Sequence, residues 1–452
     1  MTYEGALAYL ETLTNYERSH QPEAMRQVRL DRMQDVCRSL GHPERAFRSI
    51  LVAGTNAKGS ICAMIYAMLR AAGLRAGLYT SPHLSDVRER IRVSGESLEE
   101  EADWISQQAF AELIERLQPV LEALQAHPDG PVTYFEAMTA AAFLHFARTG
   151  VRVVVLEVGL GGRWDATNVV EQDVSIIGPI GFDHADVLGE GLETIAREKA
   201  GILSKGTGVV ISAPQSPEAL RTIEEAVGAS SRLVVGGRQI DATVLRHGLD
   251  GLEMKVHSLR GTHDGVHLPL IGRHQAMNAA MAVSAVEALA EDGVPYGAVH
   301  EGLARVHWPG RLEVIQQRPL VVLDGAHNPQ ALQALGEAME ELWPDRTVHL
   351  LVGMSSDKSV QAIGAHLASR AASITCTRSR HPRAADPMRL AQQLTATHQR
   401  IEVIQDPLDA CTYALNQASA SDVVVVVGSL FLVGELRSVM LRYASKEASC
   451  RS

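Results

Sequence analysis

The sequence has little of what marks several protein classes. Its five cysteines are scattered, and no Cys-x-x-Cys pair occurs, which argues against a disulfide framework or a zinc site. This pattern is typical of a reducing compartment, and we expect the cytoplasm. The longest apolar runs, 153–156 and 423–427, are far shorter than the roughly 18 residues of a membrane span. The N-terminus lacks a basic segment followed by an apolar one, so we expect no secretory signal.

Aromatic residues and positive charge are also scarce. Phe, Trp and Tyr make up 4% of the chain, and the net charge is −11. An acidic chain does not offer a general nucleic-acid surface, so we expect neither a nucleic-acid nor a membrane partner. If the protein binds anionic ligands, it must do so with local backbone amides and helix N-termini.

The 452 residues are 46% hydrophobic and 21% charged, a composition typical of a globular protein of two or three domains. Short β-branched runs alternate with helical patterns, which predicts a mainly parallel sheet covered by helices. Residues 240–271 instead show short alternating segments and predict a small antiparallel insertion. The alternation restarts after Gly310, so we place a domain boundary near Val306. The predicted strands are 49–53, 75–80, 152–158, 174–177, 208–212, 233–235, 320–323, 347–352, 373–377, 401–404 and 422–427.

A glycine-rich loop is the strongest single motif. It follows a predicted buried strand and opens a predicted helix, so its backbone N–H groups and the helix dipole attract an anion. Lys58 is placed to reach terminal phosphates, and the Ser60 hydroxyl is placed to bind Mg²⁺. The motif therefore predicts an ATP site. The loop residues are Gly54, Thr55, Asn56, Ala57, Lys58, Gly59 and Ser60.

This loop resembles the ATP loop of the Mur ligase superfamily, whose usual form is GTNGKGS or GTNGKGT. Ala57 stands where that form has glycine. If the position needs a positive φ, the alanine costs about 1–2 kcal/mol.

Further segments resemble those of folylpolyglutamate synthase and dihydrofolate synthase. They include SPHL…ERI, T-x-FE-x-x-T, E-x-G-x-GGR-x-DATN and DH…IA-x-EKAGI, and they span about residues 50 to 430. Mur cell-wall ligases carry an additional nucleotide-sugar domain before the ATP loop, whereas 53 residues precede Gly54 here, so the expected substrate is a folate. The matching segments are Tyr79–Leu84, Glu89–Ile91, Thr133–Thr139, Glu157–Asn168, Asp183-His184, Ile195–Ile202, Pro309–Arg311, Asp324–Pro329 and Gly428-Ser429.

The resemblance implies a fold and a reaction. The fold is a large P-loop ATPase-like domain, residues 1–306, followed by a smaller Rossmann-like α/β domain, residues 307–452. The reaction uses ATP and Mg²⁺, with K⁺ as a further cation, to join L-glutamate to a folate or to dihydropteroate through an acyl phosphate. Members of the family are mostly monomeric, and we expect a monomer.

The resemblance also implies the site residues of the first domain. Ser60, Ser81, Glu136 and His184 are expected to hold magnesium, and His83 to contact the substrate. Lys199 is expected to be N-carboxylated, because in the family this lysine often is. Asn278 matches a nucleotide-contacting asparagine, although a helix-surface role is an equally good interpretation of the sequence.

Four residues of the second domain complete the expected site. A guanidinium fork suits oxyanions, so Arg311 is expected to meet the ATP phosphates. Asp324 and His327 are expected to contact ribose, phosphate or glutamate, and Ser429 the glutamate carboxylate. Because these residues and the ATP loop lie in different domains, catalysis is expected to require interdomain closure.

Two alternatives remain open at this stage. The protein could be a Mur-type ligase for another carboxylate, such as a peptidoglycan precursor. It could also be a non-catalytic nucleotide-binding homologue, which only Ala57 favours. The motifs do not separate dihydrofolate synthase, folylpolyglutamate synthase and bifunctional enzymes.

Overall fold

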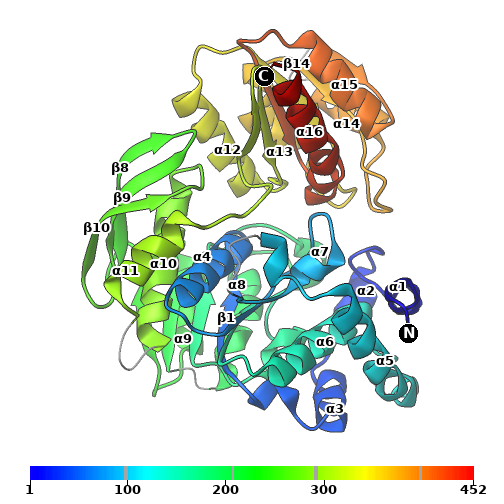
Figure 1. Cartoon of the computed structure of the whole chain (residues 1–452), viewed down its shortest axis with the longest axis vertical. Coiled ribbons are helices and arrows are strands. Elements are labelled where there is room, and N and C mark those ends of the chain that lie inside the picture. The colour runs from blue at the N-terminus through cyan, green and yellow to red at the C-terminus, as the bar shows by residue number, and fades with distance from the viewer. Residues whose placement is uncertain (96–99, 206–207, 290–293, 396–399, 452) are drawn as a thin grey trace. The chain divides into compact units, whose positions relative to one another are not determined.

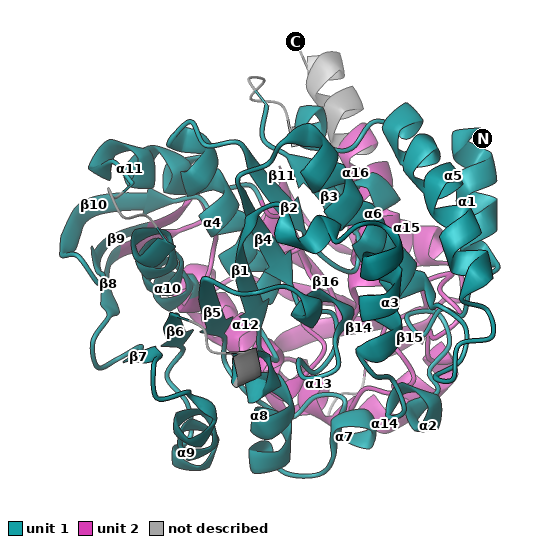
Figure 2. Ribbon diagram, turned by 90° about the horizontal axis from the view of Figure 1, so that it is seen from below, with its two compact units in different colours: residues 1–245, 253–269, 275–307 teal, residues 246–252, 270–274, 308–452 magenta. Residues whose placement is uncertain are grey.

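The computed structural model describes residues 1–95, 100–205, 208–289, 294–395 and 400–451, and the chain divides into two compact units (Figure 2). Unit 1 comprises residues 1–245, 253–269 and 275–307, and unit 2 comprises 246–252, 270–274 and 308–452. The last segment of unit 1 ends at His307, the residue after Val306.

None of the described helices is long and apolar enough to cross a membrane. Cys62, Cys376 and Cys411 are buried. Burial raises the pKa of such thiols, and that of Cys376 reaches about 12.

Unit 1 is built on a seven-stranded sheet in the order β3-β2-β4-β1-β5-β6-β7. All neighbouring strands run parallel except β3, which pairs with β2 in the antiparallel sense. The central strands are apolar on both faces because helices cover both faces of such a sheet. The strands are β1 (Arg48–Ala53), β2 (Ala76–Tyr79), β3 (Ile91–Val93), β4 (Val153–Glu157), β5 (Val174–Ile177), β6 (Val209–Ser212) and β7 (Arg232–Val235).

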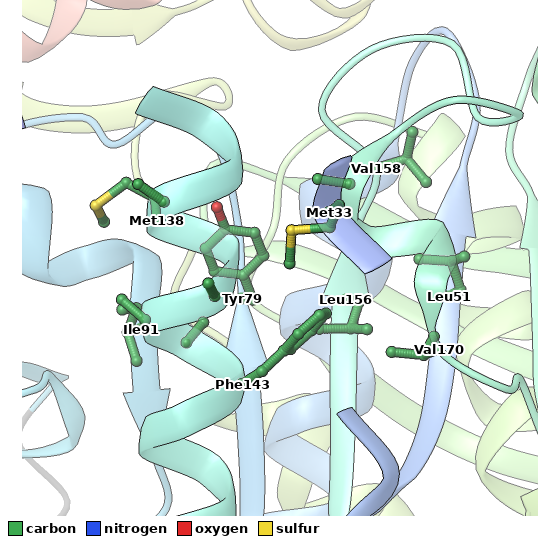
Figure 3. Packing of buried hydrophobic residues seen from close by; sticks show 14 of the residues in the cluster. Met33, Leu51, Tyr79, Ile91, Met138, Phe143, Leu156, Val158 and Val170 are labelled. Atoms are coloured by element: carbon green, nitrogen blue, oxygen red, sulfur yellow. The ribbon is translucent and has the colours of Figure 1, made fainter. Parts of the chain in front are cut away.

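Helices pack against this sheet, and Figure 1 shows α4 running beside β1. Tyr79, Phe143 and Met33 belong to one buried apolar cluster, drawn in Figure 3. The helices of unit 1 are α1 (Tyr3–Glu11), α2 (Pro22–Met25), α3 (Asp31–Ser39), α4 (Lys58–Ala71), α5 (Gln107–Ala123), α6 (Tyr134–Thr149), α7 (Ala185–Leu188), α8 (Leu192–Ala200), α9 (Pro217–Ala226), α10 (His274–Leu289) and α11 (Tyr296–Ala304), with 3-10 turns η1 (Pro43–Arg45), η2 (Val87–Arg90), η3 (Glu100–Asp103), η4 (Ala166–Val169) and η5 (Gly201–Lys205).

The segment predicted as a small insertion forms a separate three-stranded sheet in the order β10-β9-β8. Two residues connect β8 to β9, a length that only antiparallel neighbours allow. Segments 246–252 and 270–274 group with unit 2, which the sequence pattern did not predict. The strands are β8 (Asp241–Gly248), β9 (Gly251–His257) and β10 (Thr262–Leu268).

Unit 2 contains a six-stranded sheet in the order β11-β12-β16-β13-β14-β15, parallel except for the β11–β12 pair. The predicted α/β class with a mainly parallel sheet is thus confirmed. The elements are β11 (Glu313–Gln317), β12 (Leu320–Asp324), β13 (Val348–Val352), β14 (Ala371–Cys376), β15 (Ile401–Val403), β16 (Val423–Val427), α12 (Pro329–Leu342), α13 (Gln361–His366), α14 (Pro387–Leu394), α15 (Pro407–Gln417), α16 (Leu430–Arg451) and η6 (Ala368–Arg370).

Candidate active site

The glycine-rich loop joins the end of β1 to the start of α4, as predicted. The first N–H groups of a helix have no partner within the helix, so those of the first α4 turn are available to an anion. The loop is held from the other side, because the Thr55 and Asn56 N–H groups donate to the Pro179 carbonyl at 3.0 and 3.3 Å. The Thr55 hydroxyl also bonds to Gly181, at 3.1 Å. The loop is therefore anchored to the segment that follows β5.

Ala57 has the left-handed conformation, with φ 69° and ψ −10°. An L-residue is strained in this conformation. Residue 57 therefore does need a positive φ, and the alanine there carries the strain.

We expect Ala57→Gly to raise the free energy of unfolding by about 1 kcal/mol. The substitution relieves about 1–2 kcal/mol of strain, and the freer unfolded chain offsets about 0.4–1 kcal/mol of it. Urea unfolding measures the change. Ala67→Gly, in the interior of α4, is the control and should destabilise by about 1 kcal/mol. A destabilised Ala57→Gly protein would contradict the strain argument.

Two lysine side chains meet at one carbonyl oxygen of the loop. Lys58 Nζ donates to the Gly54 oxygen at 3.1 Å and to the Thr55 oxygen at 3.3 Å. Lys199, on α8 and 5% exposed, donates to the same Gly54 oxygen at 2.9 Å. The Lys58 ammonium and the N-terminus of α4 thus lie together, an arrangement suited to a polyphosphate, and the buried Lys199 side chain reaches the same loop.

Glu157 is a candidate site residue that the sequence motifs did not predict. It is the last residue of β4, it is 6% exposed, and its Oε2 accepts a hydrogen bond from the Ser81 N–H at 3.1 Å. Burial raises the pKa of Cys62, the nearby Glu157 charge raises it further, and Lys58 opposes both. Glu157 thus contacts Ser81, and its charge and that of Lys58 both act on Cys62. An acidic residue ending a buried apolar strand was the signal in the sequence.

Glu136 has a different environment from the one expected. Its carboxylate accepts from Arg32 Nε at 2.9 Å through both oxygens, and Arg32 is 3% exposed. Oε2 also accepts from the Thr133 N–H and hydroxyl, which completes a capping box at the start of α6. Both oxygens are held by protein donors, so this geometry gives no support to the magnesium role predicted for Glu136.

His184 lies just before α7 in a left-handed conformation, with φ 51°. Its backbone N–H donates to Asp183 Oδ1 at 2.9 Å, and its side chain is 27% exposed. The same segment contacts the ATP loop through Gly181 and Thr55.

Asn278 lies on α10. It is 3% exposed, and its amide donates to Gln275 at 2.9 Å. A buried amide of this kind is not the helix-surface residue that the sequence also allowed. The nucleotide role of Asn278 remains a prediction.

Three of the site residues predicted for unit 2, Asp324, His327 and Ser429, lie at the carboxyl ends of the paired parallel strands β12 and β16, and Arg311 lies just before β11, the antiparallel neighbour of β12. Asp324 ends β12, and its register partner Val427 ends β16, two residues before Ser429. The Asp324 carboxylate accepts from the Leu312 and Ala326 N–H groups at 2.8 and 2.7 Å. It therefore joins the loop that carries Arg311 to the turn that carries His327. Burial raises the pKa of Asp324, and the Arg311 and His327 charges oppose this.

His327 Nδ1 lies 2.8 Å from the Gly325 carbonyl, which can only accept, so Nδ1 carries a proton. Ser429 is 6% exposed, and its hydroxyl accepts from the Phe431 N–H at 3.2 Å. Ligands bind at this edge of open α/β sheets.

No group of three or more His, Cys, Asp or Glu side chains in the described ranges has the geometry of a metal site. Mg²⁺ is usually held by one or two carboxylates, with waters and substrate phosphates as the other ligands. Glu157, with the hydroxyls of Ser60 and Ser81 as further hard oxygen donors, suits that mode of binding.

Two family models match the chain. The Mur ligase middle domain matches residues 52–286, and the Mur ligase glutamate ligase domain matches residues 310–430. The first match covers more than half of the chain. Fold and site therefore define a Mur-type ligase.

The relatives narrow this class. The dihydrofolate synthase/folylpolyglutamate synthase of Bacillus subtilis is 35% identical over 416 residues, covering 90% of this chain and 94% of the relative. The Mycobacterium tuberculosis folylpolyglutamate synthase complexed with ADP and AMPPCP has a TM-score of 0.86 and 31% identity, covering 97% of this chain and 99% of that one. E. coli FolC in complex with DHPP and ADP has a TM-score of 0.82 and 32% identity, covering 100% and 99%. The chain belongs to the folylpolyglutamate synthase/dihydrofolate synthase family.

Proposed function

We propose that this protein is an ATP-dependent ligase that joins L-glutamate to dihydropteroate, to a folate or to both. The observation that carries the proposal is the Lys58 ammonium held against the Gly54 and Thr55 oxygens at the N-terminus of α4. The substrate carboxylate attacks the γ-phosphate and forms an acyl phosphate, and ADP leaves. The glutamate amine then attacks the acyl carbon, and phosphate leaves. Lys58 and the loop amides stabilise the charge on the transferred phosphoryl group.

Bound Mg²⁺ would neutralise phosphate charge in this reaction. We propose Ser60, Ser81, Glu157 and His184 as the residues that would hold it, with Glu157 in place of Glu136. In unit 2, we propose that Arg311 contacts phosphate, that Asp324 positions the loops of Arg311 and His327, and that Ser429 and His327 contact glutamate.

An ADP-release assay tests the proposal with dihydropteroate, tetrahydrofolate and L-glutamate, each omitted in turn. Glutamate-dependent ADP release with dihydropteroate indicates a dihydrofolate synthase, with tetrahydrofolate a folylpolyglutamate synthase, and with both a bifunctional enzyme. Replacing K⁺ with Na⁺ in the same assay tests the K⁺ requirement, and gel filtration tests the monomer. No turnover with either pterin would refute the proposal.

We propose that the protein acts in the cytoplasm.

We also propose that Lys199 is N-carboxylated in the active enzyme. Its amine adds CO₂ and releases a proton, and the resulting carbamate keeps one N–H that can still donate to the Gly54 oxygen. The side chain already points to the ATP loop, where a carbamate could approach a phosphate-bound cation.

We expect one carbamate signal in the ¹³C NMR spectrum of the enzyme in ¹³C-bicarbonate, and its loss in Lys199→Ala. Lys255→Ala is the matched control, because Lys255 is exposed and pairs with Asp264 at 2.8 Å. A signal that persists in Lys199→Ala would contradict the assignment.

A further inference from the structure

Arg90 is a buried cation that the proposed mechanism does not use. It ends η2, and its side chain is 1% exposed. Its two terminal nitrogens donate to the two carboxylate oxygens of Glu17, at 2.9 and 2.5 Å. Its Nε donates to His83 Nδ1 at 2.9 Å. The guanidinium also lies over the Tyr134 ring, 5.5 Å from its centre.

The bond to His83 assigns the tautomer of that imidazole. An arginine side chain has donors only and keeps its proton in proteins, so His83 Nδ1 must be the acceptor. The proton of the neutral ring is then on Nε2. His83 therefore presents a hydrogen-bond donor on the side of the ring away from Arg90.

Glu17 fixes Arg90 from an N-terminal turn. The Glu17 N–H donates to Asn15 Oδ1 at 2.9 Å, and the Tyr134 N–H donates to the Thr14 carbonyl at 2.9 Å. A bidentate carboxylate pair holds a guanidinium in one orientation. The orientation of the Nε–H group toward His83 therefore depends on this turn.

We propose that Arg90 is a positioning residue for the pterin-containing substrate, holding His83 as an Nε2–H donor toward an acceptor atom of that substrate. The inference rests on the proposed function. It assigns His83 to binding and excludes it as the base that deprotonates the glutamate amine, because its Nε2 already carries a proton. Glu17 acts with Arg90, because it fixes the guanidinium that orients His83.

Kinetics of Arg90→Gln and Arg90→Lys test the proposal. Lysine keeps the charge but lacks the fork that serves Glu17 and His83 together. Both variants should raise KM for the pterin substrate about tenfold or more, because a hydrogen bond from a fixed donor is lost, and should change KM for ATP less than about twofold. Arg70→Gln is the matched control. Arg70 lies on α4 and pairs with Asp103 at 2.8 Å, and its substitution should leave KM for the pterin substrate and KM for ATP nearly unchanged.

Histidine ¹⁵N NMR supplies a readout that does not depend on turnover. The His83 signals, identified by their loss in His83→Gln, should show the Nε2–H tautomer in the wild type and a mixture in Arg90→Gln. If the Arg90 variants do not fold, Glu17→Gln carries the same test, because the Glu17 side chain is 26% exposed. An Nδ1–H tautomer in the wild type, or unchanged pterin KM and tautomer in the variants, would overturn the inference. A wild-type enzyme inactive with every pterin would instead refute the proposed function.

Discussion

The Lys58→Ala enzyme is expected to lose ligation by at least about a hundredfold and to remain folded. Lys58 is the ATP-loop cation at the first turn of α4, and removing one preorganised donor from a charge-stabilising site typically costs two to three orders of magnitude in kcat. In the structure its ammonium contacts two loop carbonyls, so its loss should cost about 1 kcal/mol of stability. ADP release and thermal unfolding measure the two effects separately.

Lys255→Ala serves as the control for Lys58→Ala. Its ammonium pairs with Asp264 on the surface, so its removal should change neither rate nor stability by much. Full ligation by Lys58→Ala would remove the ATP-loop assignment. A Lys58→Ala protein that fails to fold would show that the lysine is needed first for the loop itself.

The parallel strands can be predicted from the sequence because most of them are nearly continuous apolar runs, and β5 begins and ends at the predicted residues. The sequence pattern does not predict the short strands β3 and β11. They carry polar residues such as Arg92 and Gln316, and they are held by antiparallel pairing with a neighbour, which no local pattern shows. The pattern also does not show that Leu121 lies near the end of a helix, although this leucine is fully buried.

The site can be predicted where its chemistry depends on residues adjacent in sequence, as in the ATP loop. The sequence does not reveal the partner of Glu136, because Arg32 lies 104 residues away. The apolar neighbours Phe135, Ala137 and Met138 indicate that Glu136 is buried, and a buried carboxylate needs a partner. They could not say whether that partner is a metal ion or an arginine. The same holds for Glu157. Its contact with Ser81 joins the ends of two strands that are distant in sequence.

Glu157→Gln is expected to lower kcat at least about a hundredfold and to raise the Mg²⁺ concentration needed for half-maximal activity. Glutamine keeps the shape and can still accept from the Ser81 N–H, so stability should hold or rise once the buried charge is gone. Glu136→Gln should lower stability and leave the Mg²⁺ requirement as it is. It leaves the buried Arg32 without its carboxylate and should cost about 3–5 kcal/mol of stability, with an unchanged Mg²⁺ requirement in the folded fraction.

The pair of variants separates a ligand role from a structural one, because each role predicts a different measurement. Mg²⁺ titrations of activity, Mn²⁺ binding with a non-hydrolysable ATP analogue, and urea unfolding are made on both proteins. A raised Mg²⁺ requirement in Glu136→Gln with none in Glu157→Gln would restore the assignment made from the sequence. A change in both would mean that the Arg32–Glu136 pair holds α6 in a position on which the metal site depends.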